Sequence, residues 1–193
     1  VGSNGGVVET REVLARADVV LFIGCRAGSV TTERWRYPAP GSAKIVHIDS
    51  DPAVIGANYA TDVAVAGDAK LALAALLTAI GQLKGDRGVD ARAVIADAKR
   101  RKFARFEALA NSDEAPIRPE RLVATLNRVA PHDATIVCDP GTPCPYFSAY
   151  YQVRETGRRF ISNRAHGALG YSMAAGMGAH IGRPGVKTIS VMG

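Results

Sequence analysis

The feature that most constrains the fold is a series of short, uninterrupted apolar runs along the chain. Most of them end in a turn rich in glycine, aspartate or proline, and a stretch with helical spacing of its apolar residues comes before the next. Such a run is typical of a strand that is buried on both faces, as in a parallel sheet covered by helices. Strands that alternate with helices therefore predict an α/β fold. The runs are residues 19–23, 43–48, 61–66, 134–138, 159–162 and 186–192.

The predicted elements fall into two groups separated by a polar segment. Residues 1–83 form the first group and residues 118–193 the second. Residues 84–117 between them combine a charged helix with an extended link that contains two prolines, which is typical of a domain boundary. The sequence thus predicts two incomplete domains, each built on a parallel sheet.

The helix predicted at residues 169–181 is unusually rich in glycine and alanine. Glycine in a helix is less favourable than alanine by about 1 kcal/mol, so this composition needs a structural reason. The reason we expect is close approach: of the helix to the sheet, of the helix to another subunit, or of the preceding loop to a ligand.

Composition restricts the remaining function classes. Lys and Arg number 24 against 18 Asp and Glu, which gives a net charge of +6. We interpret the basic run at residues 99–102 as a solvated helix face, because no aromatic residues are interleaved for nucleic-acid binding, and we expect no nucleic-acid partner. The three cysteines have no metal-type spacing, and no long apolar segment or signal segment is present, so we expect free thiols, no membrane association and a cytoplasmic location. A chain that starts without Met and ends just after a predicted strand is expected to be a piece of a longer polypeptide.

Four residues of the first domain lie where parallel sheets bind ligands, at the carboxyl ends of the predicted strands. Arg26 could contact a phosphate and Asp49 a ribose hydroxyl, whereas the alternative is that all four only form turns and helix caps. The glycine-rich fingerprint G-x-G-x-x-G is missing, which argues against a dinucleotide-dependent oxidoreductase. The four residues are Gly24, Arg26, Asp49 and Asp68.

At this point the sequence resembles a known family. Residues 17–77, with the segments A-D-V-V-L-F-I-G-C-R, K-I-V-H-I-D-S-D-P and G-D-A-K-L-A-L, resemble the Rossmann-like central domain of thiamine diphosphate-dependent enzymes of the acetolactate synthase group. Residues 118–193 resemble the first part of their diphosphate-binding domain, through D-P-G at 139–141, R-F-I-S-N-R-A-H-G-A-L-G-Y at 159–171 and V-M-G at 191–193.

The resemblance implies an enzyme that decarboxylates a 2-keto acid, transfers the resulting acyl carbanion, or does both. It implies thiamine diphosphate and magnesium as cofactors, FAD or an adenine nucleotide in the central domain of some members, and a homo-oligomer with the cofactor between subunits. An activating Glu would come from a separate domain, so we expect the segment alone to be inactive. The alternative is a non-catalytic nucleotide-binding or regulatory α/β module.

The resemblance also implies roles for residues of the second domain. A backbone carbonyl at Gly167 would accept a hydrogen bond from the cofactor, Ala168 would belong to the floor beneath it, and Leu169 would support its V shape. Gly141 and Thr142 would approach the diphosphate, although Pro143 lacks the N–H that would complete this cradle.

Two further positions follow from the same resemblance. Gly193 falls on the first residue of the family's G-D-G motif, and the Asp and Asn that hold magnesium would come after it, so no metal ligand is assigned within the chain. At residues 164–166 the sequence departs from the family, because R-A-H replaces its glycine-rich segment. His166 would then face the pocket near the reacting carbon, either as an acid or base or by orienting a substrate carboxylate together with Arg164. The alternative for His166 is a loop histidine that is bonded to backbone.

Overall fold

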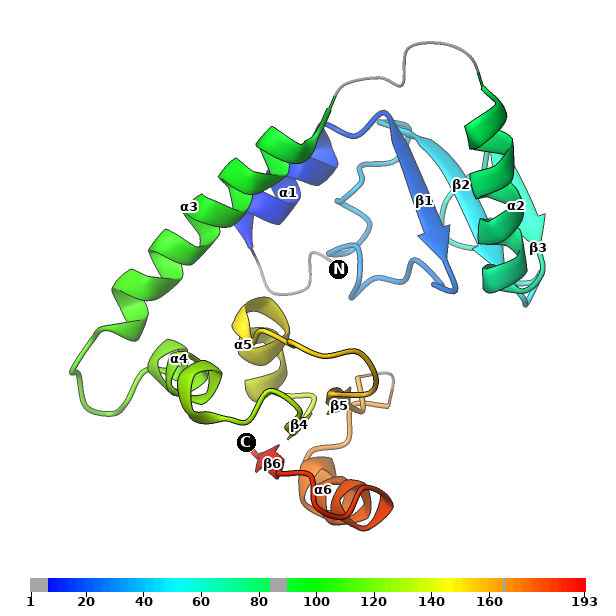
Figure 1. Ribbon diagram of the computed structural model, residues 1–193. Coiled ribbons are helices and arrows are strands. Elements are labelled where there is room, and N and C mark those ends of the chain that lie inside the picture. Colours follow the sequence, from blue (N-terminus) through cyan, green and yellow to red (C-terminus); the bar gives the residue numbers. More distant parts are fainter. Residues whose placement is uncertain (1–6, 84–89, 165) are drawn as a thin grey trace. The chain divides into compact units, whose positions relative to one another are not determined.

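The computed structural model describes residues 7–83, 90–164 and 166–193 of the chain. Contacts within the chain define two units, the first ending at Arg100 and the second beginning at Arg101. Each unit contains a three-stranded parallel sheet, so the predicted α/β fold with two parallel sheets is confirmed (Figure 1). The boundary falls within the linker predicted at 84–117, of which residues 84–89 lie outside the described part.

The first unit consists of a sheet in the order β1-β2-β3 with α2 beside it (Figure 1). Val20 of β1 is level with Ile45 of β2, and Phe22 is level with His47. Because neighbouring residues in a parallel register point to the same face, Val20, Phe22 and Ile45 form one apolar layer, and Ala27 and Tyr59 pack against it. The elements are α1 (Val8–Ala15), β1 (Val19–Ile23), β2 (Lys44–Asp49), β3 (Val63–Ala66) and α2 (Ala69–Gln82).

Much of the apolar surface of the first unit is exposed. In β1, Leu21 and Ile23 remain 38% and 39% accessible, and α2 has no buried residue. The continuous apolar runs predicted strands that are buried on both faces, and for β1 this prediction is wrong within the described residues. The physical reason is that the described helices of the unit cover the sheet only in part: α2 has no buried residue, and Leu14 of α1 lies near Leu21 and Ile23 without burying them.

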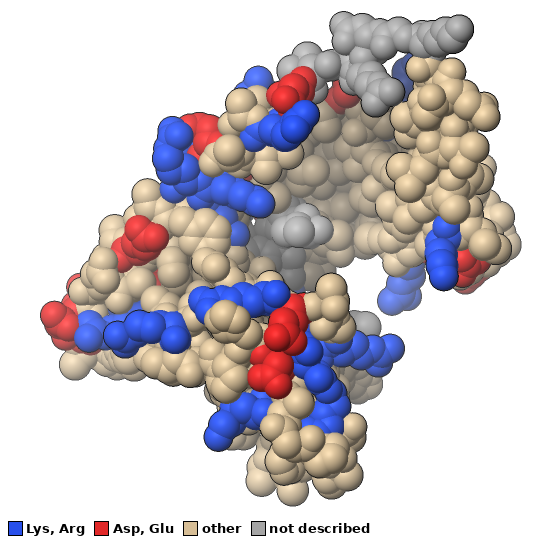
Figure 2. Space-filling view, viewed as in Figure 1, with Lys and Arg blue, Asp and Glu red and all other residues tan. Residues whose placement is uncertain are grey.

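Helix α3 (Arg92–Ala110) carries the basic run, and acidic side chains accompany it. Arg92 pairs with Asp90, and Arg100 pairs with Asp97 one turn away. Figure 2 shows blue and red side chains mixed along this helix instead of a continuous basic stripe. Residues 99–101 are exposed, as the predicted solvated face requires, whereas Lys102 is partly buried and donates to the Ala149 carbonyl.

The second unit is a three-layer arrangement with the sheet order β5-β4-β6. The central strand β4 is buried along its whole length, with α4 and α5 on one face and α6 on the other (Figure 1). The elements are α4 (Pro119–Val129), β4 (Thr135–Cys138), α5 (Pro143–Tyr150), β5 (Phe160–Ser162), α6 (Tyr171–Gly182) and β6 (Thr188–Val191).

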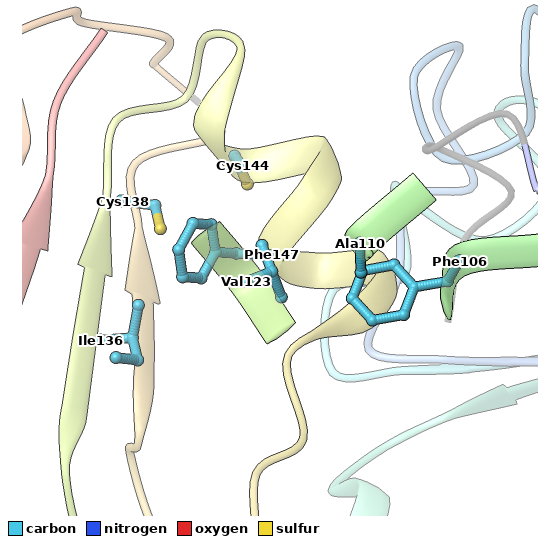
Figure 3. Packing of buried hydrophobic residues seen from close by; sticks show 7 residues of the cluster. All are labelled: Phe106, Ala110, Val123, Ile136, Cys138, Cys144 and Phe147. Carbon is cyan, nitrogen blue, oxygen red and sulfur yellow. The ribbon is translucent and has the colours of Figure 1, made fainter. Parts of the chain in front are cut away.

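The hydrophobic core of this unit lies between the sheet and the α4–α5 layer (Figure 3). Ile136 and Cys138 of β4 both point toward this face, because side chains two residues apart in a strand share a face. They pack near Val123 of α4 and Phe147 of α5, which are 0% and 2% exposed. This core fixes the position of the loop that follows β4.

On the opposite face, α6 packs closely on β6 through a glycine. A Cβ placed on Gly176 would lie 1.9 Å from the Ser190 Oγ atom, which no real contact allows. Of the reasons considered for the small-residue helix, close approach of helix to sheet is therefore present at Gly176.

Helix α5 begins earlier than the sequence indicated. We expected a rigid loop through residue 145 and a helix from Tyr146, but α5 starts at Pro143. Proline is well accommodated in the first helical turn, where its missing N–H has no helical acceptor. Of the three prolines at 140, 143 and 145 that predicted a loop, Pro143 and Pro145 are therefore part of the first helical turn, and Pro140 precedes it.

Core packing predicts unequal effects of two valines on the same helix. Replacing Val123 with Ala removes two buried methyl groups and leaves a cavity, which should lower the free energy of unfolding by about 2 kcal/mol. Val129→Ala is the control, because Val129 is 60% exposed, and it should change stability by less than about 0.5 kcal/mol. Urea unfolding measures both, and equal losses would contradict the assigned core.

Two glycines of α6 provide a second test. Gly176→Ala should destabilise the protein by about 1–3 kcal/mol through overpacking, and adding Ser190→Ala should recover part of the loss. Gly178→Ala should be neutral or stabilising by up to about 1 kcal/mol, since nothing lies within 4 Å of its added Cβ. Thermal unfolding distinguishes the variants, and a stable Gly176→Ala protein would disprove the close contact.

Candidate functional site

Three loops meet at the carboxyl edge of the second sheet. They are residues 139–142 after β4, residues 163–164 and 166–170 after β5, and residues 192–193 after β6. All three strands are parallel, so their carboxyl ends lie at the same edge, which is where such sheets bind ligands. This edge is the candidate site.

Asp139 connects the three loops. Its Oδ2 atom accepts hydrogen bonds from the backbone N–H groups of Gly170 at 2.9 Å and Gly193 at 3.3 Å, and its Oδ1 atom accepts one from Ser172 at 2.8 Å. The residue is only 2% exposed. One buried carboxylate therefore bonds the start of α6 and the end of β6 to the loop after β4.

These bonds lower the pKa of the Asp139 carboxyl below that of an ordinary aspartate. The pKa of this carboxyl falls from its ordinary value of 3.8 to about 2. The hydrogen bond from the Ser172 N–H has the largest effect and that from the Gly170 N–H the next largest, because each bond favours the ionised form. Burial acts in the opposite direction and is outweighed. The side chain is therefore ionised across the neutral range.

Gly141, Leu169 and Gly193 converge at one point of the edge. A Cβ on Gly141 would lie 2.9 Å from the Gly193 carbonyl oxygen and 2.9 Å from the Leu169 Cδ2 atom. Glycine is required at 141 because the backbone of the loop after β4 lies close to Leu169 and Gly193 of the other two loops. Leu169 packs against this point while most of its side chain, 68%, stays exposed. Three residues predicted to bind the cofactor are thus adjacent.

The loop after β5 is shaped by hydrogen bonds at its base. Asn163 accepts from the N–H of Gly167 at 2.9 Å through its carbonyl and from the N–H of His166 at 3.3 Å through its side chain. Gly167 has a φ of +76°, a left-handed conformation that favours glycine. Arg164 donates from Nη1 to the Pro140 carbonyl at 2.9 Å, which links this loop to the loop after β4.

His166 is exposed on this loop, and Ala168 is partly buried beside it. No hydrogen bond to the imidazole of His166 is observed among the described residues, so its ring is available at the edge. Its predicted role as an acid, a base or a carboxylate ligand stays a prediction. Ala165, next to it in the quoted motif, lies outside the described residues.

The start of α5 has fewer backbone donors than an ordinary helix. Pro143 and Pro145 stand at its first and third positions, and neither has an N–H. The sequence predicted one missing N–H, at Pro143. Because the helix starts at Pro143, Pro145 also lies in its first turn and lacks a second N–H. Thr142 precedes the helix without a side-chain capping bond, so its hydroxyl is not used for capping there.

The four residues predicted in the first unit also lie at a carboxyl edge, but they have local roles. Asp49 accepts from the N–H of Asp51 at 2.9 Å, and Asp68 caps α2 by accepting from Leu71 at 3.0 Å. Arg26 accepts from the Asn58 side chain through its carbonyl, and Gly24 directly follows β1. Turn and cap roles are therefore present, and nucleotide binding stays a prediction.

A cavity of about 510 Å³ lies at the opposite edge of the first sheet, by the amino ends of β2 and β3. Asp18, Lys44 and Asp62 line it. Asp62 accepts from the N–H of Ile45 at 2.7 Å, so this carboxylate helps to hold β2 in place. The cavity is separate from the predicted nucleotide residues.

Asp139 is the main residue whose role the sequence did not reveal. It was visible as the first residue of the D-P-G motif, but the sequence gives no sign of partners 31 to 54 residues away. A carboxylate directly after a buried strand and before Pro-Gly is the signal that could have drawn attention to it.

The described residues contain neither a metal-binding cluster of side chains nor a membrane-spanning helix. Residues 7–83, 90–164 and 166–193 contain no group of three His, Cys, Asp or Glu side chains arranged to hold a metal ion. Within the same ranges, no helix is long and apolar enough to cross a membrane. The three cysteines are free thiols.

Two family models match the chain. Residues 1–76 match the central domain of thiamine pyrophosphate enzymes, and residues 139–193 match their C-terminal TPP binding domain. The second match begins at Asp139 and contains all three loops of the candidate site. The chain belongs to the thiamine pyrophosphate enzyme family.

Known proteins are similar in sequence to this chain along nearly its whole length. A "Probable acetolactate synthase large subunit" of Methanocaldococcus jannaschii is 30% identical over 97% of this chain and 32% of its own length. "Acetolactate synthase 2, chloroplastic" of Zea mays is 29% identical over 97% of this chain and 29% of its own length. A "Probable 2-ketoarginine decarboxylase" of Pseudomonas aeruginosa is 32% identical over 90% of this chain and 29% of its own length. The chain thus spans about a third of the length of these relatives.

The low pKa of Asp139 predicts a pH-dependent contribution to stability. The folded pKa of about 2 lies below the unfolded value of about 3.9, so the unfolded state binds more protons between them and the stabilisation is lost as pH falls from about 4 to about 2. Wild type should exceed Asp139→Asn in urea stability at neutral pH, and the difference should shrink in that window. A difference that stays constant down to about pH 2.5 would contradict the assignment.

Proposed function

We propose that this chain is the part of a thiamine diphosphate- and magnesium-dependent enzyme that joins the central domain to the cofactor-binding domain. The full-length protein would decarboxylate a 2-keto acid, transfer the resulting acyl unit, or do both, as a lyase or transferase. The observation that carries the proposal is the convergence of Gly141, Leu169 and Gly193 at one sheet edge, inside the segment that matches the TPP binding domain.

The residues present fit one side of the cofactor. Gly141 lacks the Cβ that would fill the space between the loops, and Leu169 presents an exposed apolar side chain beside it, suited to contact an aromatic or thiazole ring. When bound, thiamine diphosphate would supply the electron sink that a 2-keto acid needs to lose carbon dioxide.

The chain's own groups would then bind and orient. The Gly167 carbonyl would accept a hydrogen bond from the cofactor's amino group, and Leu169 would hold the two rings at an angle by contact. The Thr142 hydroxyl and the N–H groups that remain at the start of α5 would bond phosphate oxygens. The exposed His166 would donate or accept a proton, or bond a substrate carboxylate.

Magnesium belongs to the proposal although the described residues contain no group to hold it. The magnesium part of the proposal rests on the match to the TPP binding domain, in which Gly193 brings the third loop of the site beside Gly141. We infer the same for a flavin or adenine nucleotide at the carboxyl edge of the first sheet, where Gly24, Arg26, Asp49 and Asp68 lie.

We also infer a homo-oligomer with the cofactor near a subunit contact, in the cytoplasm. Large apolar side chains are exposed every four residues from the site along α6, and such a stripe is typical of a protein interface. They are Leu169, Met173, Met177 and Ile181, which are 61–78% exposed.

The full-length protein tests the proposed function directly. It should bind thiamine diphosphate in a magnesium-dependent manner in calorimetry and release carbon dioxide from at least one member of a panel of 2-keto acids that includes pyruvate and 2-ketoarginine. Binding without turnover of any 2-keto acid would favour a regulatory module. Absence of binding would contradict the proposal.

The cradle at Gly141 predicts a specific loss of affinity. Gly141→Ala should displace Gly193 and Leu169 and weaken cofactor binding about tenfold or more, because the added methyl overlaps a backbone oxygen that cannot move alone. Gly81→Ala is the matched control, since nothing lies within 4 Å of its Cβ. Calorimetric titration with thiamine diphosphate measures both, and equal affinities would show that the cradle is not the binding site.

A further inference from the structure

The N-terminus of α6 is capped in an unusual way. The residue at its N-cap is Gly170, which has a φ of +80° and no side chain that could accept a hydrogen bond. Helices usually satisfy their first N–H groups with a Ser, Thr, Asp or Asn at this position. Here the acceptor for the N–H of Ser172 is Asp139, 33 residues earlier in the chain and directly after another strand.

A cap supplied from a distance also acts as a tether. A local N-cap would fix only the first turn of its own helix, whereas Asp139 holds the N–H groups of Gly170 and Ser172 on the loop after β4. The same carboxylate accepts from the N–H of Gly193 and so includes the end of β6. Each of these three segments contains or borders a residue assigned to the cofactor.

The electrostatics support the same arrangement. The first turn of a helix carries partial positive charge, which favours an anion at this place. The Asp139 carboxylate already occupies this place and is 2% exposed, so the helix end is neutralised from within the chain. The α6 end therefore serves to hold the loops.

We propose that Asp139 is a positioning residue of the cofactor site, whose carboxylate holds residues 139–142, residues 167–172 and Gly193 together as one unit. The effect on cofactor binding rests on the proposed function, whereas the coupling of the three segments does not. A residue that only capped α6 would stabilise the helix without controlling the other two segments.

Hydrogen exchange of the cofactor-free, full-length protein tests the coupling. In Asp139→Ala, exchange should increase together in peptides that cover residues 139–142, 167–172 and 193. Asp133→Ala removes an acidic side chain from the other end of β4 and should change none of them. Faster exchange confined to residues 167–172 would reduce Asp139 to a local cap and overturn the proposal.

Cofactor affinity provides a second measurement that general destabilisation would not change. Asp139→Ala should bind thiamine diphosphate about tenfold more weakly, the equivalent of one lost charge-assisted hydrogen bond. Val123→Ala, whose side chain is in the core away from the loops, should lose stability but keep the wild-type affinity. Equal affinities of the two variants would overturn the proposal.

The proposal stays testable if the Asp139→Ala variant does not fold or if the wild-type protein does not bind the cofactor. If Asp139→Ala is not recovered folded, Asp139→Asn keeps the shape and replaces one acceptor oxygen by a donor, and it should show the same three exchanging segments. If the wild-type protein fails to bind thiamine diphosphate, the proposed function fails, and the exchange pattern still decides whether Asp139 couples the loops.

Discussion

The second unit depends on one buried carboxylate. Asp139 follows the fully buried strand β4, and three backbone N–H groups from two other segments converge on it. Backbone donors keep it ionised despite its burial, and their number explains why the charge is tolerated at the edge of a hydrophobic core. The packing of β4 between two helix layers fixes where the carboxylate lies, and the carboxylate in turn fixes the loops.

Sequence patterns were sufficient wherever the determining contacts are local. The apolar runs located the strands of the described residues, and the glycine and proline positions located most of the loops, because backbone conformation depends on the residue at that position. The partners of Asp139 could not be predicted, since their sequence separation hides the contact. The early start of α5 was missed for another reason: Pro143 and Pro145 are equally compatible with a loop and with a first helical turn.

Burial in the first unit shows a different limit. The run at residues 19–23 correctly predicts a strand, but the extent to which it is covered depends on elements elsewhere in the protein. Leu21 and Ile23 remain accessible here, and a family model for the central domain matches this region. An apolar run indicates what a strand can bury, whereas the packing neighbours decide how much of it is buried.

The prolines around the loop after β4 have a consequence for the thermodynamics of ligand binding. Pro140, Pro143 and Pro145 each fix φ at about −65°, so this segment has few backbone conformations to lose when a ligand orders it. A glycine-rich phosphate loop provides more N–H donors but loses more conformational entropy on binding. This chain has the opposite balance, with fewer donors on a preorganised backbone, so association at this edge should carry a small entropic penalty.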